Sequence, residues 1–279
     1  MLVNLKQILE IAEKGNFAIP AFNVYNMETV MGVIYAAEEL KAPVILQVYP
    51  RLMKEDTGYF LSPVILAAAK KATVPVCFHL DHGPSELETT RSLRYGATGI
   101  MLDGSTLPFE ENIALTKRVA ETCAYLDVQV EGELGHVGTT KDDTMDEFTT
   151  PEDAKRFVEE TGVSCLAVAV GTAHGRYSKP PKLDIERIKA IREATNNTAL
   201  VLHGGSGVPD EEVKKAVAAG IRKMNIATDV CYAFLDCCFE ELAKPDRAIA
   251  IDSFMKKPID AVKVFAMEKI KLVEADGKA

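Results

Sequence analysis

Short apolar runs alternate along the chain with amphipathic segments at a nearly regular spacing. The apolar residues of these runs follow one another almost without a break, which is typical of parallel strands covered on both faces. We expect eight such strands, at residues 18–24, 43–49, 74–81, 98–103, 127–133, 164–170, 199–203 and 222–227. The intervening segments have helical periodicity and predict helices at residues 27–40, 63–72, 85–95, 150–160 and 209–219.

Eight strand–helix units in succession predict an α/β fold, a single (β/α)8 TIM barrel domain over residues 1–279. After the eighth strand, apolar spacing at residues 230–242 and 258–273 predicts a C-terminal extension over residues 230–279 with two extra helices.

One polar stretch, residues 134–150, is too long for an ordinary barrel turn and is rich in Gly, Thr and Asp. It follows the fifth strand, on the face where barrels carry their active sites. We therefore expect a mobile active-site loop here, and the alternative is a solvated surface excursion.

Three histidines stand at the ends of predicted strands, each beside a glycine: His82, His174 and His203. The carboxyl ends of barrel strands meet on one face, so these imidazoles are expected to converge. Three imidazoles with an open fourth position form a catalytic zinc site, so we predict a bound Zn2+ ion. Three unrelated structural histidines are the alternative. Of the other two, we expect His79 to be a hydrogen-bonded interior residue and His136 to be solvated.

Carboxylates accompany these histidines at the strand ends. Asp81 directly precedes His82 and is the predicted catalytic base. Asp103 follows the fourth strand, and Glu131 and Glu133 end the fifth. We expect Asp103 and Glu133 to orient the metal ligands or to offer an alternate metal position, and helix capping is the alternative for each.

The last two strands end in glycine and hydroxyl residues, GGSG at 204–207 and NIATD at 225–229. Backbone N–H groups of glycine turns and helix N-termini bind anions, and phosphate sites in these barrels often follow strands seven and eight. Tight turns without a ligand are the alternative. The predicted phosphate-binding residues are Gly175, Gly204, Ser206, Asn225, Ala227 and Thr228.

Charge and cysteine content limit the classes of binding partner and the cellular location that we expect. The net charge of −9 at pH 7 argues against nucleic-acid binding, so an anionic substrate has to be held by local donors. Six cysteines without a C-x-x-C pair favour a reducing, cytoplasmic location. No apolar run is long enough to span a membrane, and the N-terminal residues lack the layout of a signal peptide.

Taken in order, the motifs resemble the class II (zinc-dependent) ketose-bisphosphate aldolases, which include fructose- and tagatose-bisphosphate aldolases. The resemblance extends from PAFNVYN (20–26) through HLDHG (79–83), VEGELG (130–135) and AVGTAHGRY (169–177) to NIATD (225–229). It implies a reversible, zinc-assisted retro-aldol cleavage of a ketose 1,6-bisphosphate to dihydroxyacetone phosphate and an aldehyde. It also implies a homo-oligomer, either a dimer or a tetramer.

The resemblance also assigns roles to individual residues. It implies that Asp81 handles the proton of the C4 hydroxyl and that Asn23 is an active-site asparagine. It makes Gly175 and Gly204 backbone contacts to a monovalent cation, Na+ or K+, near the phosphate. The implied zinc ligands are His82, His174 and His203, and the implied phosphate contacts are Ser206, Asn225 and Thr228.

Three departures from the family pattern concern the aldehyde half of the substrate. Lys141 stands about where the family's loop has a glutamate, and Thr106 replaces a histidine after strand four. Tyr49 replaces a small hydroxyl residue after strand two, and with Arg51 it is expected to contact the distal end of the substrate. The alternative substrate is a ketose 1-phosphate with a distal sulfonate or carboxylate, such as sulfofructose 1-phosphate.

Two other readings remain open beside an ordinary bisphosphate aldolase. Loss of the loop glutamate is compatible with a non-catalytic sugar-phosphate-binding barrel. The same scaffold also suits a metal-dependent isomerase or epimerase, which would not cleave a carbon–carbon bond. The intact Asp81–His82 pair favours the aldolase over a non-catalytic barrel.

Overall fold

A computed structural model of the chain describes residues 1–135, 148–173, 175, 177, 180–246 and 250–279. Its eight strands pair in parallel and in sequence order, and pairing of β1 with β8 closes the barrel. This confirms the expected (β/α)8 fold, and each predicted strand is found. The strands are β1 (Ile19–Asn23), β2 (Val44–Val48), β3 (Val76–Gly83), β4 (Gly99–Leu102), β5 (Gln129–Leu134), β6 (Cys165–Val168), β7 (Ala199–Leu202) and β8 (Ile221–Ile226).

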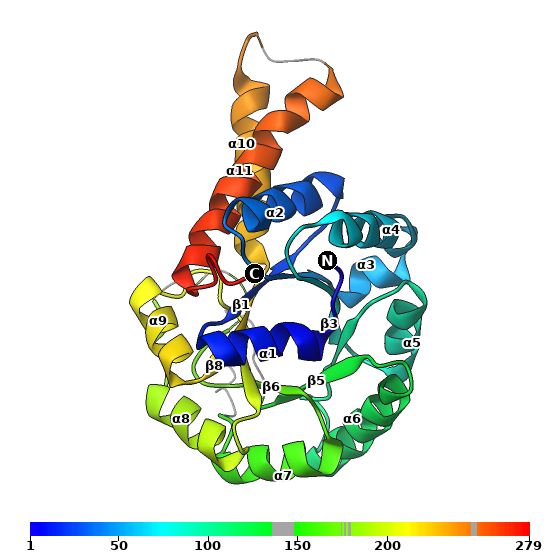
Figure 1. The fold of residues 1–279 in the computed structure, drawn as a ribbon, viewed down its shortest axis with the longest axis vertical. Helices are drawn as coiled ribbons and strands as arrows, with labels where there is room; N and C mark the ends of the chain where they lie inside the picture. The colour runs from blue at the N-terminus through cyan, green and yellow to red at the C-terminus, as the bar shows by residue number, and fades with distance from the viewer. Residues whose placement is uncertain (136–147, 174, 176, 178–179, 247–249) are drawn as a thin grey trace.

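Helices surround the barrel as an outer ring (Figure 1). The N-terminus of α7 follows from its sequence, since the side chain of Thr150 caps the helix and Pro151 occupies the first turn. The ring comprises α2 (Met27–Glu39), α3 (Pro50–Lys54), α4 (Asp56–Lys71), α5 (Glu86–Arg94), α6 (Phe109–Ala124), α7 (Pro151–Thr161), α8 (Ile185–Ala194) and α9 (Asp210–Ala219).

The N-terminal helix α1 (Leu5–Gly15) lies across the end of the barrel at which the strands begin (Figure 1). The backbone N–H of Val3 donates to the carbonyl of Val76, and that of Leu5 donates to the carbonyl of Thr98. Within α1, the side chains of Leu5 and Ile8 are fully buried. Because α1 covers this end, the chemistry has to use the opposite, carboxyl-terminal face.

Beyond β8, α10 (Thr228–Ala243) and α11 (Ile251–Leu272) project from the ring as an arm (Figure 1). Helix α10 completes the eighth strand–helix unit, so α11 is the helix added to the barrel. Its Val262 packs so closely on α2 that a Cβ at Gly32 would lie 2.7 Å from the Val262 side chain.

Two helices begin earlier than the sequence predicted. Helix α4 starts at Asp56 rather than residue 63, and α11 starts at Ile251 rather than residue 258. A proline therefore lies inside each helix, at Pro63 and Pro258. Proline removes one N–H and usually marks a first turn, which is why the pattern placed both starts too late.

The barrel interior contains polar side chains as well as apolar ones. Gln47, His79, Glu131 and Lys223 are each fully buried. Barrel interiors are filled by layers of inward-facing side chains, and buried polar groups require partners. This polar interior lies directly below the carboxyl-terminal face.

In the part of the chain that the structure describes, no helix combines the length and the apolar character that crossing a bilayer requires.

Candidate active site

Strand β3 carries Asp81 and His82, which are adjacent in sequence and reach the same site. In a regular strand, neighbouring side chains point to opposite faces. The pairing of β3 with β4 shifts register between Leu80 and Gly83, and His82 has φ +48°. This left-handed conformation is uncommon outside glycine, and a bulge of this kind re-aims a side chain. The irregularity therefore allows one strand to supply both residues.

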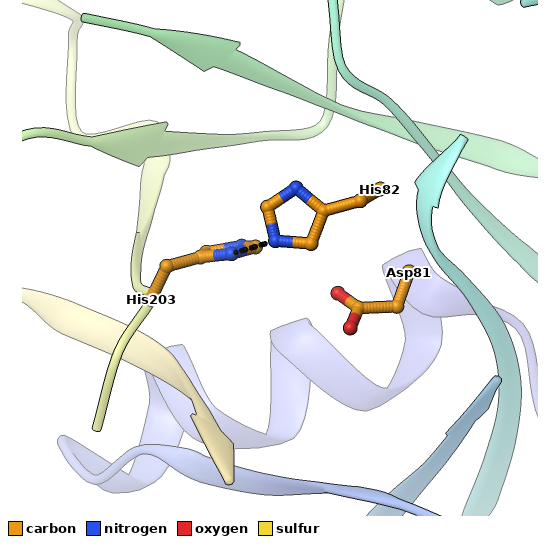
Figure 2. A group of neighbouring side chains, drawn as sticks. All are labelled: Asp81, His82 and His203. Atoms are coloured by element: carbon orange, nitrogen blue, oxygen red, sulfur yellow. Dashed lines mark hydrogen bonds between the residues drawn. The ribbon is translucent and has the colours of Figure 1, made fainter. Parts of the chain in front are cut away.

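The imidazoles of His82 and His203 face each other. His82 Nε2 lies 2.9 Å from His203 Nδ1. Figure 2 shows the two rings in contact, with the carboxylate of Asp81 pointing toward them. One ligand atom from each of these three residues lies within 4.8 Å of the others. Two of the three predicted zinc ligands therefore converge beside the predicted base. His174, the third, lies outside the described residues.

In each imidazole, the outer nitrogen, which faces away from the other ring, lies beside a carboxylate. The inner nitrogen faces the other ring. His82 Nδ1 lies 2.7 Å from Asp103 Oδ2, and His203 Nε2 lies 2.8 Å from Glu131 Oε1. When each outer nitrogen donates its hydrogen to its carboxylate, both inner nitrogens present lone pairs to each other. Such an arrangement requires a positive charge between them, either a proton or a metal ion. Carboxylate–histidine pairs of this kind accompany most metal-binding histidines.

The carboxylates also create a negative potential at His82. Its Nδ1 lies 3.6 Å from Glu133 Oε2, and His82, Asp103 and Glu133 form a second group that could hold a metal ion. Burial opposes protonation of His82, yet the charges of Asp81, Asp103 and Glu133 outweigh it and raise the pKa to about 10. The same potential favours a divalent cation. Asp103 and Glu133 thus lie where the sequence predicted, and an alternate metal position remains a prediction.

Two amides hold the carboxylate of Asp81. Asn23 Nδ2 donates to Oδ2 at 2.9 Å, and Asn225 Nδ2 donates to Oδ1 at 3.0 Å. Burial favours the neutral acid, but the positive charges of His82 and His203 in their protonated form and of the Lys223 ammonium together lower the pKa of Asp81. The carboxylate form, which a general base requires, is therefore the favoured one.

A cavity of about 140 Å³ adjoins Asp81 at the ends of β7 and β8. A Cβ at Gly204, where φ is +62°, would lie 2.4 Å from the carbonyl oxygen of Ala173, so only glycine fits. Helix α10 begins at Thr228, its N-cap residue Ala227 has no capping side chain, and the N–H of Asp229 in its first turn donates to Ser206 Oγ at 3.4 Å. A helix N-terminus favours a bound anion. All six predicted phosphate-binding residues line this cavity, with Gly205, Asn23 and Asp81: Gly175, Gly204, Ser206, Asn225, Ala227 and Thr228.

The two predicted distal residues form a small cluster with Tyr25. Arg51 Nη2 donates to Tyr49 Oη at 2.5 Å, and its guanidinium lies 5.2 Å from the centre of the Tyr49 ring. Tyr49 packs edge-on against Tyr25, whose hydroxyl lies 3.4 Å from the carbonyl oxygen of Ala227, on the cavity wall. Lys141 and most of the expected loop, residues 136–147, lie outside the described residues.

Sequence reasoning missed two interior residues that support the site, Lys223 and Gln47. Lys223 Nζ lies 2.8 Å from Glu131 Oε2 and donates to Asn225 Oδ1 at 2.6 Å. Gln47 Nε2 donates to Asn23 Oδ1 at 2.7 Å. Glu131 was recognised as a strand-end carboxylate but was given no specific role. A polar residue at an inward-facing position of an otherwise apolar strand is the signal that marks Gln47 and Lys223.

His79 lies in the interior as expected, but the predicted hydrogen bond is not found among the described residues. Neither ring nitrogen has a partner there, and Nε2 is 3.5 Å from Glu131 Oε2. Burial and the ammonium of Lys223 lower the pKa of His79 to about 3. Its ring is therefore neutral, and the contact with Glu131 is not an ion pair. His136 lies outside the described residues.

The Asp103 contact predicts an effect on metal affinity. Replacing Asp103 by Ala removes the acceptor that orients His82, and Zn²⁺ affinity should fall by about 10- to 100-fold. Competition with a chromophoric chelator measures this change, and Asp252→Ala, an exposed change on α11, is the matched control. Equal affinity in both variants would show that Asp103 does not orient a metal ligand.

Comparisons with known proteins agree with the fold and show the family. The family model of class-II fructose-bisphosphate aldolases matches residues 3–278. The YdjI aldolase of Escherichia coli K12 is 39% identical, with a TM-score of 0.90 and 100% of each chain covered. A putative fructose-1,6-bisphosphate aldolase of Coccidioides immitis is 28% identical, with a TM-score of 0.89 and 99% and 97% covered.

A third structure, the fructose-bisphosphate aldolase of Campylobacter jejuni, is 24% identical, with a TM-score of 0.84 and 100% and 97% covered, and it supports the fold alone. The family match spans nearly the whole chain. This chain belongs to the class II fructose-bisphosphate aldolase family and is a carbon–carbon lyase.

Proposed function

We propose that this enzyme is a zinc-dependent aldolase that reversibly cleaves a ketose 1-phosphate or 1,6-bisphosphate to dihydroxyacetone phosphate and an aldehyde. The facing nitrogens of His82 and His203, with Asp81 beside them, carry the proposal. The donor set fits Zn²⁺, which favours imidazole ligands. His82 and His203 would hold the ion together with His174.

The residues of the site suit a retro-aldol cleavage. A phosphate group bound in the glycine-lined cavity fixes the ketone-derived half of the substrate next to Asp81. Asp81 accepts the proton of the C4 hydroxyl, the C3–C4 bond breaks, and the hydroxyl carbon becomes the aldehyde. The bonding electrons remain on C3 of the ketone-derived half as negative charge, and a proton taken up from solvent at C3 then completes dihydroxyacetone phosphate. A bound zinc ion supplies a Lewis acid that stabilises this negative charge.

Asn23 and Asn225 keep Asp81 ready for this step. Their amide hydrogens occupy both carboxylate oxygens, which restricts the rotation of the side chain. In the reverse direction, the protonated Asp81 returns its proton to the oxygen of the new hydroxyl group. Gly175 and Gly204 are the proposed backbone contacts for a monovalent cation, Na+ or K+, beside the phosphate.

The substrate class follows from the two ends of the site. The phosphate cavity supports dihydroxyacetone phosphate as one product, and the family description favours a ketose 1,6-bisphosphate of the fructose or tagatose type. The Arg51–Tyr49 pair supports a second candidate, a ketose 1-phosphate with a distal carboxylate or sulfonate. The Arg51 guanidinium, hydrogen-bonded to the Tyr49 phenol, offers N–H donors to a carboxylate or a sulfonate.

The chain also has a surface suited to a second copy of itself. On α10, Tyr232, Leu235, Phe239 and Leu242 are 42%, 48%, 69% and 53% exposed. Their spacing of three and four residues is that of a helix–helix seam. Because exposed apolar stripes of this kind are usually covered, we propose a homo-oligomer, a dimer or a tetramer, that uses this seam.

All six cysteines are described and are free thiols, which supports a cytoplasmic location.

Metal removal tests the proposed chemistry. Release of dihydroxyacetone phosphate should stop when a chelator removes the metal and should return when Zn²⁺ is added. A coupled assay on 1,6-bisphosphates and on ketose 1-phosphates with a distal carboxylate or sulfonate identifies the preferred class. Cleavage that resists chelation and leaves a lysine trapped by borohydride would refute a metal-dependent mechanism.

Replacing the base tests the role of Asp81. Asp81→Ala should retain zinc and lose roughly 10²- to 10⁴-fold in turnover, the usual contribution of general acid–base catalysis. Metal analysis of the purified variant separates a lost base from a lost ion. Wild-type turnover in Asp81→Ala would remove this residue from the mechanism.

The seam on α10 predicts the oligomeric state. Light scattering of the wild type should give a mass at least twice the chain mass of 30.4 kDa, and Phe239→Glu should lower it because a charge enters the apolar seam. Val264→Glu, at a 56% exposed position on α11, is the matched control and should leave the mass unchanged. A monomeric wild type would contradict the proposal.

A further inference from the structure

Lys223 is a charged residue that lies entirely inside the barrel. It points inward from β8, and its side chain is 0% exposed. An ammonium in such a place is costly unless it is paired and hydrogen-bonded. Two contacts hold it, the carboxylate of Glu131 at 2.8 Å and the amide oxygen of Asn225 at 2.6 Å. Lys223 does not line the substrate cavity, so it acts through these neighbours.

The first contact leads to the metal side of the site. Lys223 binds Oε2 of Glu131, and the other oxygen, Oε1, lies 2.8 Å from His203 Nε2. Because the ammonium fixes one oxygen, the carboxylate presents the other to the imidazole. This arrangement holds the hydrogen of His203 on Nε2 and leaves Nδ1 directed toward His82.

The second contact leads to the base. An amide has one donor end and one acceptor end, so a partner on one end fixes the direction of the other. The oxygen of Asn225 accepts from Lys223, and its nitrogen therefore donates to Asp81 Oδ1 at 3.0 Å. A flipped amide would place its oxygen against the carboxylate and its nitrogen against the ammonium, and both contacts would be repulsive.

The other oxygen of Asp81 is held by a similar series of hydrogen bonds that does not include Lys223. Gln47 Nε2 donates to the oxygen of Asn23, whose nitrogen donates to Asp81 Oδ2. Gln47 is fully buried on β2 and is not in the cavity lining. It thus supports the base alone, whereas Lys223 contacts residues that support both the base and His203. This difference provides an internal comparison.

We propose that Lys223 is a positioning residue that joins the two halves of the active site, orienting His203 through Glu131 and Asp81 through Asn225. The inference rests on the proposed function, in which His203 binds the metal and Asp81 moves the proton. A buried ion pair contributes little net stability compared with apolar packing, so stability alone does not account for a lysine here. Its ammonium satisfies two acceptors that face different parts of the site.

Two variants of similar shape separate these roles. Lys223→Met removes both contacts, and Gln47→Met removes only the contact with Asn23. In Lys223→Met we expect both Zn²⁺ affinity and kcat to fall by about 10- to 100-fold. In Gln47→Met we expect kcat to fall by about tenfold while Zn²⁺ affinity stays within about threefold of the wild type. KM is measured alongside kcat, because Asn225 and Asn23, which these two residues orient, line the substrate cavity.

The measurements are zinc titration against a chromophoric chelator, kcat and KM at saturating zinc, and circular dichroism as a check on folding. A folded Lys223→Met with wild-type zinc affinity and kcat would overturn the proposal. An equal loss of zinc affinity in Gln47→Met would also overturn it, because the effect would then be a general loosening of the interior.

Lys223→Met leaves Glu131 buried without its cation and can fail to fold for that reason. The double variant Lys223→Met/Glu131→Gln removes both charges and keeps an oxygen for His203. We expect it to fold and to lose about tenfold in kcat at saturating zinc, because Asn225 is no longer oriented. Wild-type kcat in the folded double variant would overturn the proposal.

These readouts are separable from the proposed function. A wild type that binds zinc but cleaves no ketose phosphate would refute the proposed reaction and not the role of Lys223. In that case the zinc titrations still decide, since Lys223→Met should weaken binding and Gln47→Met should not. Equal affinities in the wild type and Lys223→Met would then overturn the positioning role.

Discussion

Two imidazoles that face each other, each with a carboxylate behind it, form the contact on which the rest of the site depends. The inner nitrogens of His82 and His203 are 2.9 Å apart, and Asp103 and Glu131 occupy the outer nitrogens. With its outer hydrogen directed to a carboxylate, each ring turns a lone pair toward the other ring. A proton or a metal ion between the rings relieves this repulsion, so the carboxylates of Asp103 and Glu131 favour a cation at this position.

The barrel provides this arrangement by departing locally from regular structure. A regular β3 could direct either Asp81 or His82 to the site at the carboxyl-terminal face but not both. The register shift and the left-handed backbone conformation of His82 remove that limit. The ends of β7 and β8, which lie across the closed barrel from β3, then supply His203, the glycine turn and Asn225. The facing histidines, Asp81 and the glycine-lined cavity therefore adjoin one another although they come from distant parts of the chain.

Below the mouth, the interior is polar where many barrels are apolar, and its hydrogen bonds have definite directions. Gln47 and Lys223 each fix one asparagine, and the two asparagines occupy both oxygens of Asp81. Each amide is directed by a buried partner that a substrate does not displace. Asp81 is thus oriented before substrate binds, and under the proposed mechanism this reduces the reorganisation that proton transfer requires.

The sequence predicted the barrel because parallel strands buried on both faces leave a strong apolar signal, repeated eight times. It also located His82, His203, Asp81 and the cavity, since strand ends in a barrel share one face. Helix starts near Pro63 and Pro258 were wrong because a proline inside a helix looks like a first turn. The contacts of Lys223 with Glu131 and Asn225 were not predictable. The pairing of inward side chains depends on barrel register, which periodicity does not fix.

The position of the metal tests the account most directly. Crystals grown with Zn²⁺ and measured at the zinc absorption edge would locate the ion by its anomalous signal. We predict one ion at about 2.0–2.1 Å from both His82 Nε2 and His203 Nδ1, with Asp103 and Glu131 still on the outer nitrogens. Zinc bound elsewhere, while those two nitrogens remain hydrogen-bonded to each other, would contradict the account.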